Sequence, residues 1–140
     1  MSKIAVVYWS GTGNTEAMAN EVVAGAAAAG AEAEAFTPDA FSADKVDEYD
    51  AIAFGCPSMG VEELEDSEFA PLFDECEPKL SGKKIALFGS YGWGDGEWMR
   101  NWEDRCKEAG AVLATDFVIC MEAPDDEAVE ACKALGAALA

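Results

Sequence analysis

Residues 4–16 read IAVVYWSGTGNTE, an apolar segment that runs directly into a glycine-containing turn. Its first five residues, Ile4 to Tyr8, are short, apolar and partly β-branched, which predicts a buried strand. Residues 17–23 then place apolar side chains at helical spacing, with polar side chains between them. The stretch therefore predicts a strand, a tight turn and a helix.

The turn also predicts a site for a phosphate-sized anion. Its two glycines let the backbone turn tightly, and the helix N-terminus adds unpaired N–H groups and the positive end of a dipole. No lysine follows as in a Walker A loop, and Glu16 stands where the dinucleotide fingerprint needs a third glycine. Neutral hydrogen-bond donors without a cation suit a single terminal phosphate. The alternative to an anion site is an ordinary glycine-rich turn with a polar helix cap. The side-chain donors are Ser10, Thr12, Asn14 and Thr15.

The rest of the chain alternates strands with helices. After the first helix, which we expect to end near residue 30, strands are predicted at 31–36, 51–56, 83–89 and 111–119. Helices are predicted at 67–76, 97–109 and 125–139, and residues 37–49 as loop with a short helical turn. Five strands in this alternation predict an open parallel sheet covered on both faces, in a single domain over residues 1–140. Right-handed crossovers place loops 9–16, 56–66 and 89–96 and the loop after Ile119 at one edge, and the first three of these should form one pocket.

Charge and composition exclude several function classes. The net charge is −19, from 28 acidic and 9 basic residues, which argues against nucleic acid and anionic membranes as partners. No apolar run approaches the roughly 20 residues of a membrane span, and no signal peptide is recognised. Five scattered cysteines without a CxxC pair fit a reducing cytoplasm. The chain has no histidine, the usual general base. The negative charge serves either solubility or steering toward basic partners.

Three motifs give the chain a resemblance to a known family. They are Tyr8 to Thr15, Gly55 to Gly60 with Glu62, and Leu87 to Gly94. In this order, and over nearly the whole length, they resemble the short-chain flavodoxins of anaerobic bacteria, whose last strand is not split by an insertion. The resemblance implies a doubly wound α/β fold with strand order 2-1-3-4-5. It also implies a low-potential one-electron carrier with non-covalent FMN, shuttling between semiquinone and hydroquinone, and not an enzyme. The expected partners are reductases and ferredoxin-type oxidoreductases with basic surfaces. The protein itself is expected to be a monomer.

The resemblance also implies roles for individual residues. The four polar side chains of the first turn would hold the FMN phosphate, Trp93 would stack on one ring face and Met59 would cover the other. Glu62 would bond the ring N3–H, and the Gly60–Val61 peptide would turn over on reduction. Pro57 stands where some relatives have a phosphate-binding serine, with Ser58 as the candidate substitute. The predicted cofactor-binding residues are Ser10, Gly11, Thr12, Gly13, Asn14, Thr15, Ser58, Met59, Gly60, Val61, Glu62, Ser90, Tyr91, Gly92, Trp93 and Gly94.

Two other readings of the same fold class are less well supported. A quinone or azo reductase would need a substrate pocket and a pyridine-nucleotide site, for which the chain has little spare sequence. A receiver-type signalling domain would need an acceptor aspartate after the third strand, where Cys56 and Pro57 stand.

Overall fold

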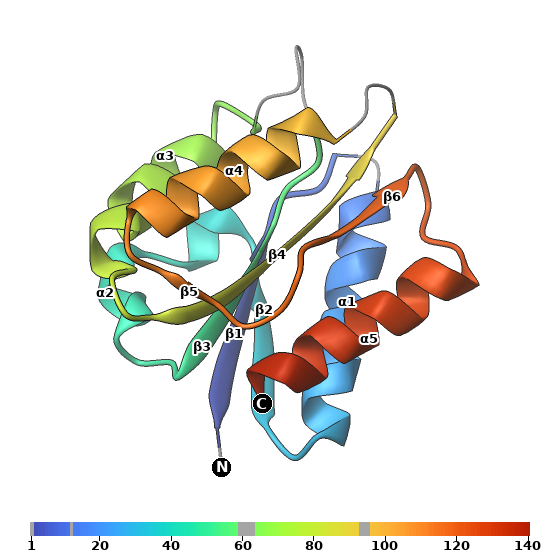
Figure 1. Ribbon diagram of the computed structural model, residues 1–140, viewed down its shortest axis with the longest axis horizontal. Coiled ribbons are helices and arrows are strands. Elements are labelled where there is room, and N and C mark those ends of the chain that lie inside the picture. The colour runs from blue at the N-terminus through green and yellow to red at the C-terminus, as the bar shows by residue number, and fades with distance from the viewer. Residues whose placement is uncertain (1, 12, 59–63, 93–95) are drawn as a thin grey trace.

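The computed structural model describes residues 2–11, 13–58, 64–92 and 96–140. A parallel sheet with strand order β2-β1-β3-β4-β5 forms its centre, and β6 also pairs with β4 (Figure 1). This confirms the predicted fold class and strand order. The strands are β1 (Lys3–Tyr8), β2 (Glu32–Phe36), β3 (Ala51–Gly55), β4 (Lys84–Tyr91), β5 (Val112–Leu113) and β6 (Val118–Met121).

Helices cover both faces of the sheet. In Figure 1, α1 and α5 lie together on one face, and α3 and α4 lie on the other. The helices are α1 (Asn14–Ala28), α2 (Ala43–Val46), α3 (Phe69–Cys76), α4 (Glu97–Glu108) and α5 (Asp126–Leu139). Short 3₁₀ helices at Pro38–Ala40 and Glu77–Lys79 complete the connections, so the region 37–49 is loop with short helical turns, as predicted.

Alternation along the central strands explains the two layers. In β1, Ala5 and Val7 pack into the apolar cluster under α3 and α4. Ile4 and Val6 pack into the cluster under α1 and α5. All four side chains are fully buried. A strand covered on both faces reads as a continuous apolar run, which is why the sequence identified it so directly.

The two helices on the α1 side pack backbone against backbone. A Cβ added to Gly25 of α1 would overlap the carbonyl oxygen of Lys133 in α5, and one added to Gly136 would overlap that of Val22. Two glycines therefore set the distance between these helices. Asp125 begins α5, where its carboxylate accepts a hydrogen bond from the Ala128 N–H at 2.8 Å.

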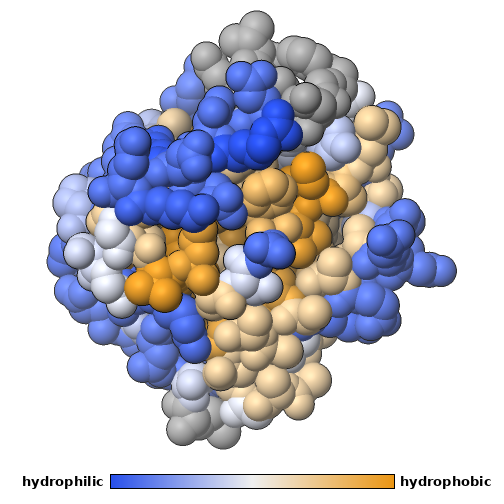
Figure 2. All heavy atoms as spheres, in the orientation of Figure 1, coloured by the Kyte–Doolittle hydropathy of each residue, from blue (hydrophilic) through white to orange (hydrophobic). Residues whose placement is uncertain are grey.

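The last strand differs from the prediction of one continuous strand over 111–119. It forms two pieces, with Leu113 opposite Ile85 and Val118 opposite Phe88. From the first pair to the second the last strand advances five residues and β4 only three, so two extra residues interrupt the ladder. Figure 2 shows apolar side chains along this sheet edge, beside the hydrophilic outer face of α4. Val112 and Met121 are more than half exposed there.

Candidate functional site

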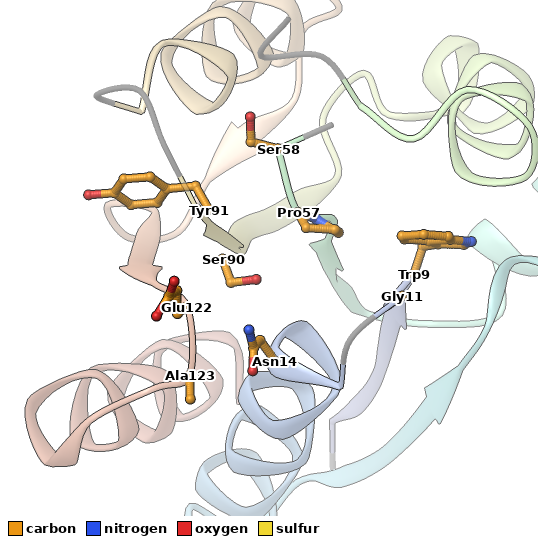
Figure 3. A pocket seen from close by; sticks show the side chains of 10 residues that line it. Trp9, Gly11, Asn14, Pro57, Ser58, Ser90, Tyr91, Glu122 and Ala123 are labelled. Carbon is orange, nitrogen blue, oxygen red and sulfur yellow. The ribbon is translucent and has the colours of Figure 1, made fainter. Parts of the chain in front are cut away.

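A cavity of about 540 Å³ opens at the carboxyl ends of β1, β3, β4 and β6. This volume lies in the range of small-molecule sites, roughly 300–1,000 Å³. The cavity adjoins β1, where the strand order reverses, and ligands of open α/β sheets bind at such points. Its wall, drawn in Figure 3, consists of Trp9, Gly11, Asn14, Pro57, Ser58, Ser90, Tyr91, Gly92, Glu122 and Ala123.

The turn between β1 and α1 presents backbone to this region. Gly13 begins α1 in the left-handed conformation, at φ 94°, and its N–H donates to Ser10 Oγ at 3.0 Å. Gly13 precedes the helix and has no side chain that could cap it, and the N–H groups of the first turn of any α-helix have no acceptor within the helix. A Cβ on Gly11 would lie 2.9 Å from the Trp9 ring, so glycine lets this ring lie close to the turn. This arrangement is suited to an anion.

The opposite wall is the end of β4, which extends two residues beyond the predicted end at residue 89. Gly89 lacks the Cβ that would overlap the carbonyl oxygen of Cys56, so β3 and β4 stay in close contact there. The Ser90 carbonyl accepts the Ser58 N–H at 3.0 Å. The Ser90 hydroxyl lies 3.0 Å from that of Thr15. Ser90 therefore connects three segments of the cavity.

A third wall comes from the segment after β6, which the sequence analysis left out of the pocket. Glu122 has a positive φ of 58°, and its N–H donates to the Tyr91 carbonyl at 2.8 Å. Figure 3 shows the side chains of Glu122 and Ala123 beside Asn14. Their place at the carboxyl end of the last strand was the available signal. Trp9 was also missed as a wall residue, although it lies in the motif itself.

Behind the turn lies a second hollow of about 360 Å³, which Ser10 and Gly13 line. Its polar groups already bond one another. The Trp9 indole N–H donates to Glu68 at 2.8 Å, and the Tyr8 hydroxyl donates to Glu16 at 3.2 Å. Burial and then this hydrogen bond with Glu16 raise the pKa of Tyr8. These hydrogen bonds therefore help to fix the turn between β1 and α1.

The segment that follows β3 is anchored by a buried carboxylate. Glu65, only 4% exposed, accepts hydrogen bonds from the backbone N–H groups of Ser67, Glu68 and Phe69 and from the Ser67 hydroxyl. Burial raises its pKa, but these hydrogen bonds outweigh burial and hold the pKa below its ordinary value. The Glu65 N–H donates to Cys56 Sγ at 3.3 Å, and burial raises the pKa of Cys56 to about 12. Cys56 is therefore a neutral thiol and a poor nucleophile.

The structure brings most of the described site residues together. Thr15 lies behind Ser90, and Ser10 and Gly13 line the second hollow. On the cavity wall are Gly11, Asn14, Ser58, Ser90, Tyr91 and Gly92. Outside the described residues are Thr12, Met59, Gly60, Val61, Glu62, Trp93 and Gly94.

The chemistry of the cavity fits FMN. One end offers the N-terminus of α1 with neutral amide and hydroxyl donors, which suit a phosphate. The wall also carries the aromatic rings of Trp9 and Tyr91, which suit a flat, largely apolar ring system. The described residues contain no cluster of metal ligands, and none of their helices is long and apolar enough to cross a membrane.

Comparisons with known proteins agree with this chemistry. The model of the flavodoxin family matches residues 6–135. A flavodoxin of Megasphaera elsdenii is 50% identical over 137 residues, covering 98% of both chains. One of Clostridium beijerinckii is 44% identical over 135 residues, covering 96% of this chain and 97% of the relative.

Solved structures point the same way. The solution structure of two-electron reduced M. elsdenii flavodoxin superimposes with a TM-score of 0.90 at 52% identity, covering 97% of both chains. A flavodoxin from the domain Archaea gives 0.83 at 29% identity, covering 96% of this chain and 93% of the other. The chain therefore belongs to the flavodoxin family, and it is an FMN-binding, low-potential electron-transfer protein rather than an enzyme.

Proposed function

We propose that the chain holds the FMN phosphate at the N-terminus of α1 and the flavin ring along the cavity toward Tyr91 and Gly92. The observation that supports this most is the position of the α1 N-terminus, where Asn14, the first residue of the helix, lines the cavity. Ser10, Asn14 and Thr15 are the described side chains proposed to serve the phosphate. Thr12 would serve it as well.

The remaining ring contacts are proposed from the sequence. Trp93 and Met59 would cover the two ring faces, Glu62 would bond the N3–H, and backbone N–H groups of Gly92 and Trp93 would meet the O2 and N1 edge. When bound, FMN supplies the one-electron chemistry, and the protein supplies position, exclusion of water and electrostatics.

The test is reconstitution of the apoprotein with FMN and with riboflavin, followed by quenching of flavin fluorescence. We expect one FMN per chain, and tighter binding of FMN than of riboflavin because only FMN carries the phosphate. Asn14→Ala should lower the affinity for FMN more than the affinity for riboflavin. Equal affinities for FMN and riboflavin in the wild-type protein would reject the phosphate site.

We further propose that redox partners dock with basic surfaces at the cofactor end. Basic side chains gather at the opposite end of the sheet: Lys3 and Lys84 begin β1 and β4, and Lys107 lies in the last turn of α4. Asp66 and Glu68, by contrast, are exposed after the β3 loop. Such a separation of charge orients a basic partner toward the cofactor end and speeds encounter.

A pair of charge reversals tests this orientation. Electron-transfer rates to a basic c-type cytochrome should fall as ionic strength rises, and Asp66→Lys should lower the rate at low salt. Glu32→Lys changes the net charge equally but lies at the start of β2, so it should lower the rate less. Equal effects of the two variants would show that only net charge matters.

We also propose that the protein is a cytoplasmic monomer. All five cysteines are free, as a reducing compartment would keep them. Analytical ultracentrifugation of the FMN-loaded protein should give the mass of one chain, and a concentration-dependent dimer would contradict this.

A further inference from the structure

The hydroxyl groups of Thr15 and Ser90 form a buried pair at the cavity wall, to which Ser90 belongs. Their oxygens are 3.0 Å apart although the residues are 75 positions apart in the chain. Thr15 is 1% exposed and Ser90 is 4% exposed. Thr15 belongs to the first turn of α1, and Ser90 is the penultimate residue of β4. The pair therefore joins the proposed phosphate end of the site to its opposite wall.

The direction of this hydrogen bond is free to change. A hydroxyl donates one proton and accepts at its lone pairs, so the pair uses only one of its two protons internally. The positive end of the α1 dipole repels a proton on Thr15, which favours donation from Thr15 to Ser90 in the absence of an anion. An anion beside α1 reverses this preference, because it attracts the Thr15 proton.

We propose that Ser90 is a positioning residue for phosphate binding. It donates its proton to Thr15 Oγ1, so that Thr15 directs its own proton to the phosphate. This inference rests on the proposed function, which places the phosphate at the N-terminus of α1. The residue that contacts the phosphate is Thr15, and Ser90 acts through it.

The backbone around the pair keeps the two oxygens in place. The Ser90 carbonyl accepts the Ser58 N–H at 3.0 Å, and Ser90 lies opposite Cys120 in the β4–β6 ladder. Thr15 is held in α1, and its β-branched side chain has few accessible rotamers. The backbone therefore keeps the two hydroxyl oxygens within hydrogen-bond distance of each other.

The experiment titrates the apoprotein with FMN, riboflavin and inorganic phosphate. We expect Ser90→Ala to lower the affinity for FMN and for inorganic phosphate about tenfold, which is the usual effect of one lost hydrogen bond. The affinity for riboflavin should change by less than about twofold. Thr15→Ala should lower the affinity for FMN at least as much. The double variant should lower it no further than Thr15→Ala alone. Thr15→Ser keeps the hydroxyl and should keep the ratio of FMN to riboflavin affinity. Ser81→Ala, at an exposed serine, is the control.

Each contrary outcome has its own meaning. Equal weakening of FMN and riboflavin by Ser90→Ala would place Ser90 in direct contact with the rest of the cofactor and overturn the inference. No weakening of either ligand would also overturn it, because the pair would then be purely structural. If Thr15→Ala left the FMN-to-riboflavin ratio unchanged, the proposed phosphate site itself would fail. Ser90→Cys replaces the hydroxyl by a slightly larger group that is a weaker donor, so it should give an intermediate loss even if Ser90→Ala does not fold.

Discussion

Replacing Glu65 by Gln should destabilise the protein by about 2–4 kcal/mol at pH 7. One carboxylate oxygen accepts from the N–H and hydroxyl of Ser67, and the other accepts from the N–H groups of Glu68 and Phe69 at 2.7 and 2.8 Å. An amide keeps one acceptor oxygen and turns an NH₂ group toward the remaining donors. Two hydrogen bonds to a charged acceptor are then lost, each worth about 1.5–3 kcal/mol, and exposure of Ser67 offsets part of the cost.

The dependence on pH identifies the charge as the cause. The folded state holds the Glu65 pKa below its ordinary value of 4.5, so the unfolded chain binds the proton more readily. The ionised carboxylate therefore stabilises the fold fully above pH 4.5, and this contribution is lost as the pH falls through the folded pKa. The difference between wild type and Glu65→Gln should be largest near neutral pH and should shrink in acid.

Urea unfolding of the apoprotein, followed by far-UV circular dichroism, measures both effects. With a urea slope of about 2 kcal/mol/M for a domain of this size, the midpoint should fall by about 1–2 M. The control is Glu75→Gln, which removes an exposed carboxylate from α3 and should change stability by no more than about 0.5 kcal/mol. Equal midpoints for the two variants, or a difference that does not shrink in acid, would refute the assignment of Glu65 as the anchor of this segment.

Further tests address other parts of the molecule. Gly136→Ala should cost about 1–3 kcal/mol in urea unfolding because its Cβ would overlap α1, whereas Ala27→Ser on the exposed side of α1 should be nearly neutral. Asp125→Ala removes the α5 cap and should cost about 1 kcal/mol by the same assay. Among the cysteines only Cys120 is partly exposed, so a disulfide reagent should label it first in the native protein; simultaneous labelling of all five would contradict the burial pattern. FMN affinity should rise with salt, and a steep fall would show that a cation binds the phosphate.

The sequence predicted the sheet because its local signals were strong. Residues 4–7 and 51–55 are buried on both faces, so they read as continuous apolar runs. The predicted end of β4 at residue 89 fell two residues short, because the missing Cβ of Gly89 admits the Cys56 carbonyl and the strand continues to Tyr91. The two extra residues in the last strand left no such signal, because register depends on the neighbouring strand.

Only the part of the site that depends on local chain geometry could be predicted from the sequence. The glycines and hydroxyls of residues 10–15 point to an anion through local chain geometry alone. The Thr15–Ser90 pair and the approach of Glu122 to Tyr91 depend on how distant segments meet, which no local pattern encodes. Glu122 adopts a positive φ, which few non-glycine residues do, and only the structure reveals it.

A chain of net charge −19 is able to bind an anionic cofactor because the two electrostatic effects act at different distances. A surface carboxylate about 10 Å from the phosphate costs roughly 0.4 kcal/mol at the dielectric constant of water, and salt reduces this further. A hydrogen bond to a charged acceptor contributes about 1.5–3 kcal/mol, so the donors of the α1 N-terminus outweigh several distant carboxylates. Salt weakens the long-range repulsion of the cofactor and, equally, the long-range attraction of a basic partner. The two binding events should therefore respond to ionic strength with opposite sign, because the same surface charge opposes one and favours the other.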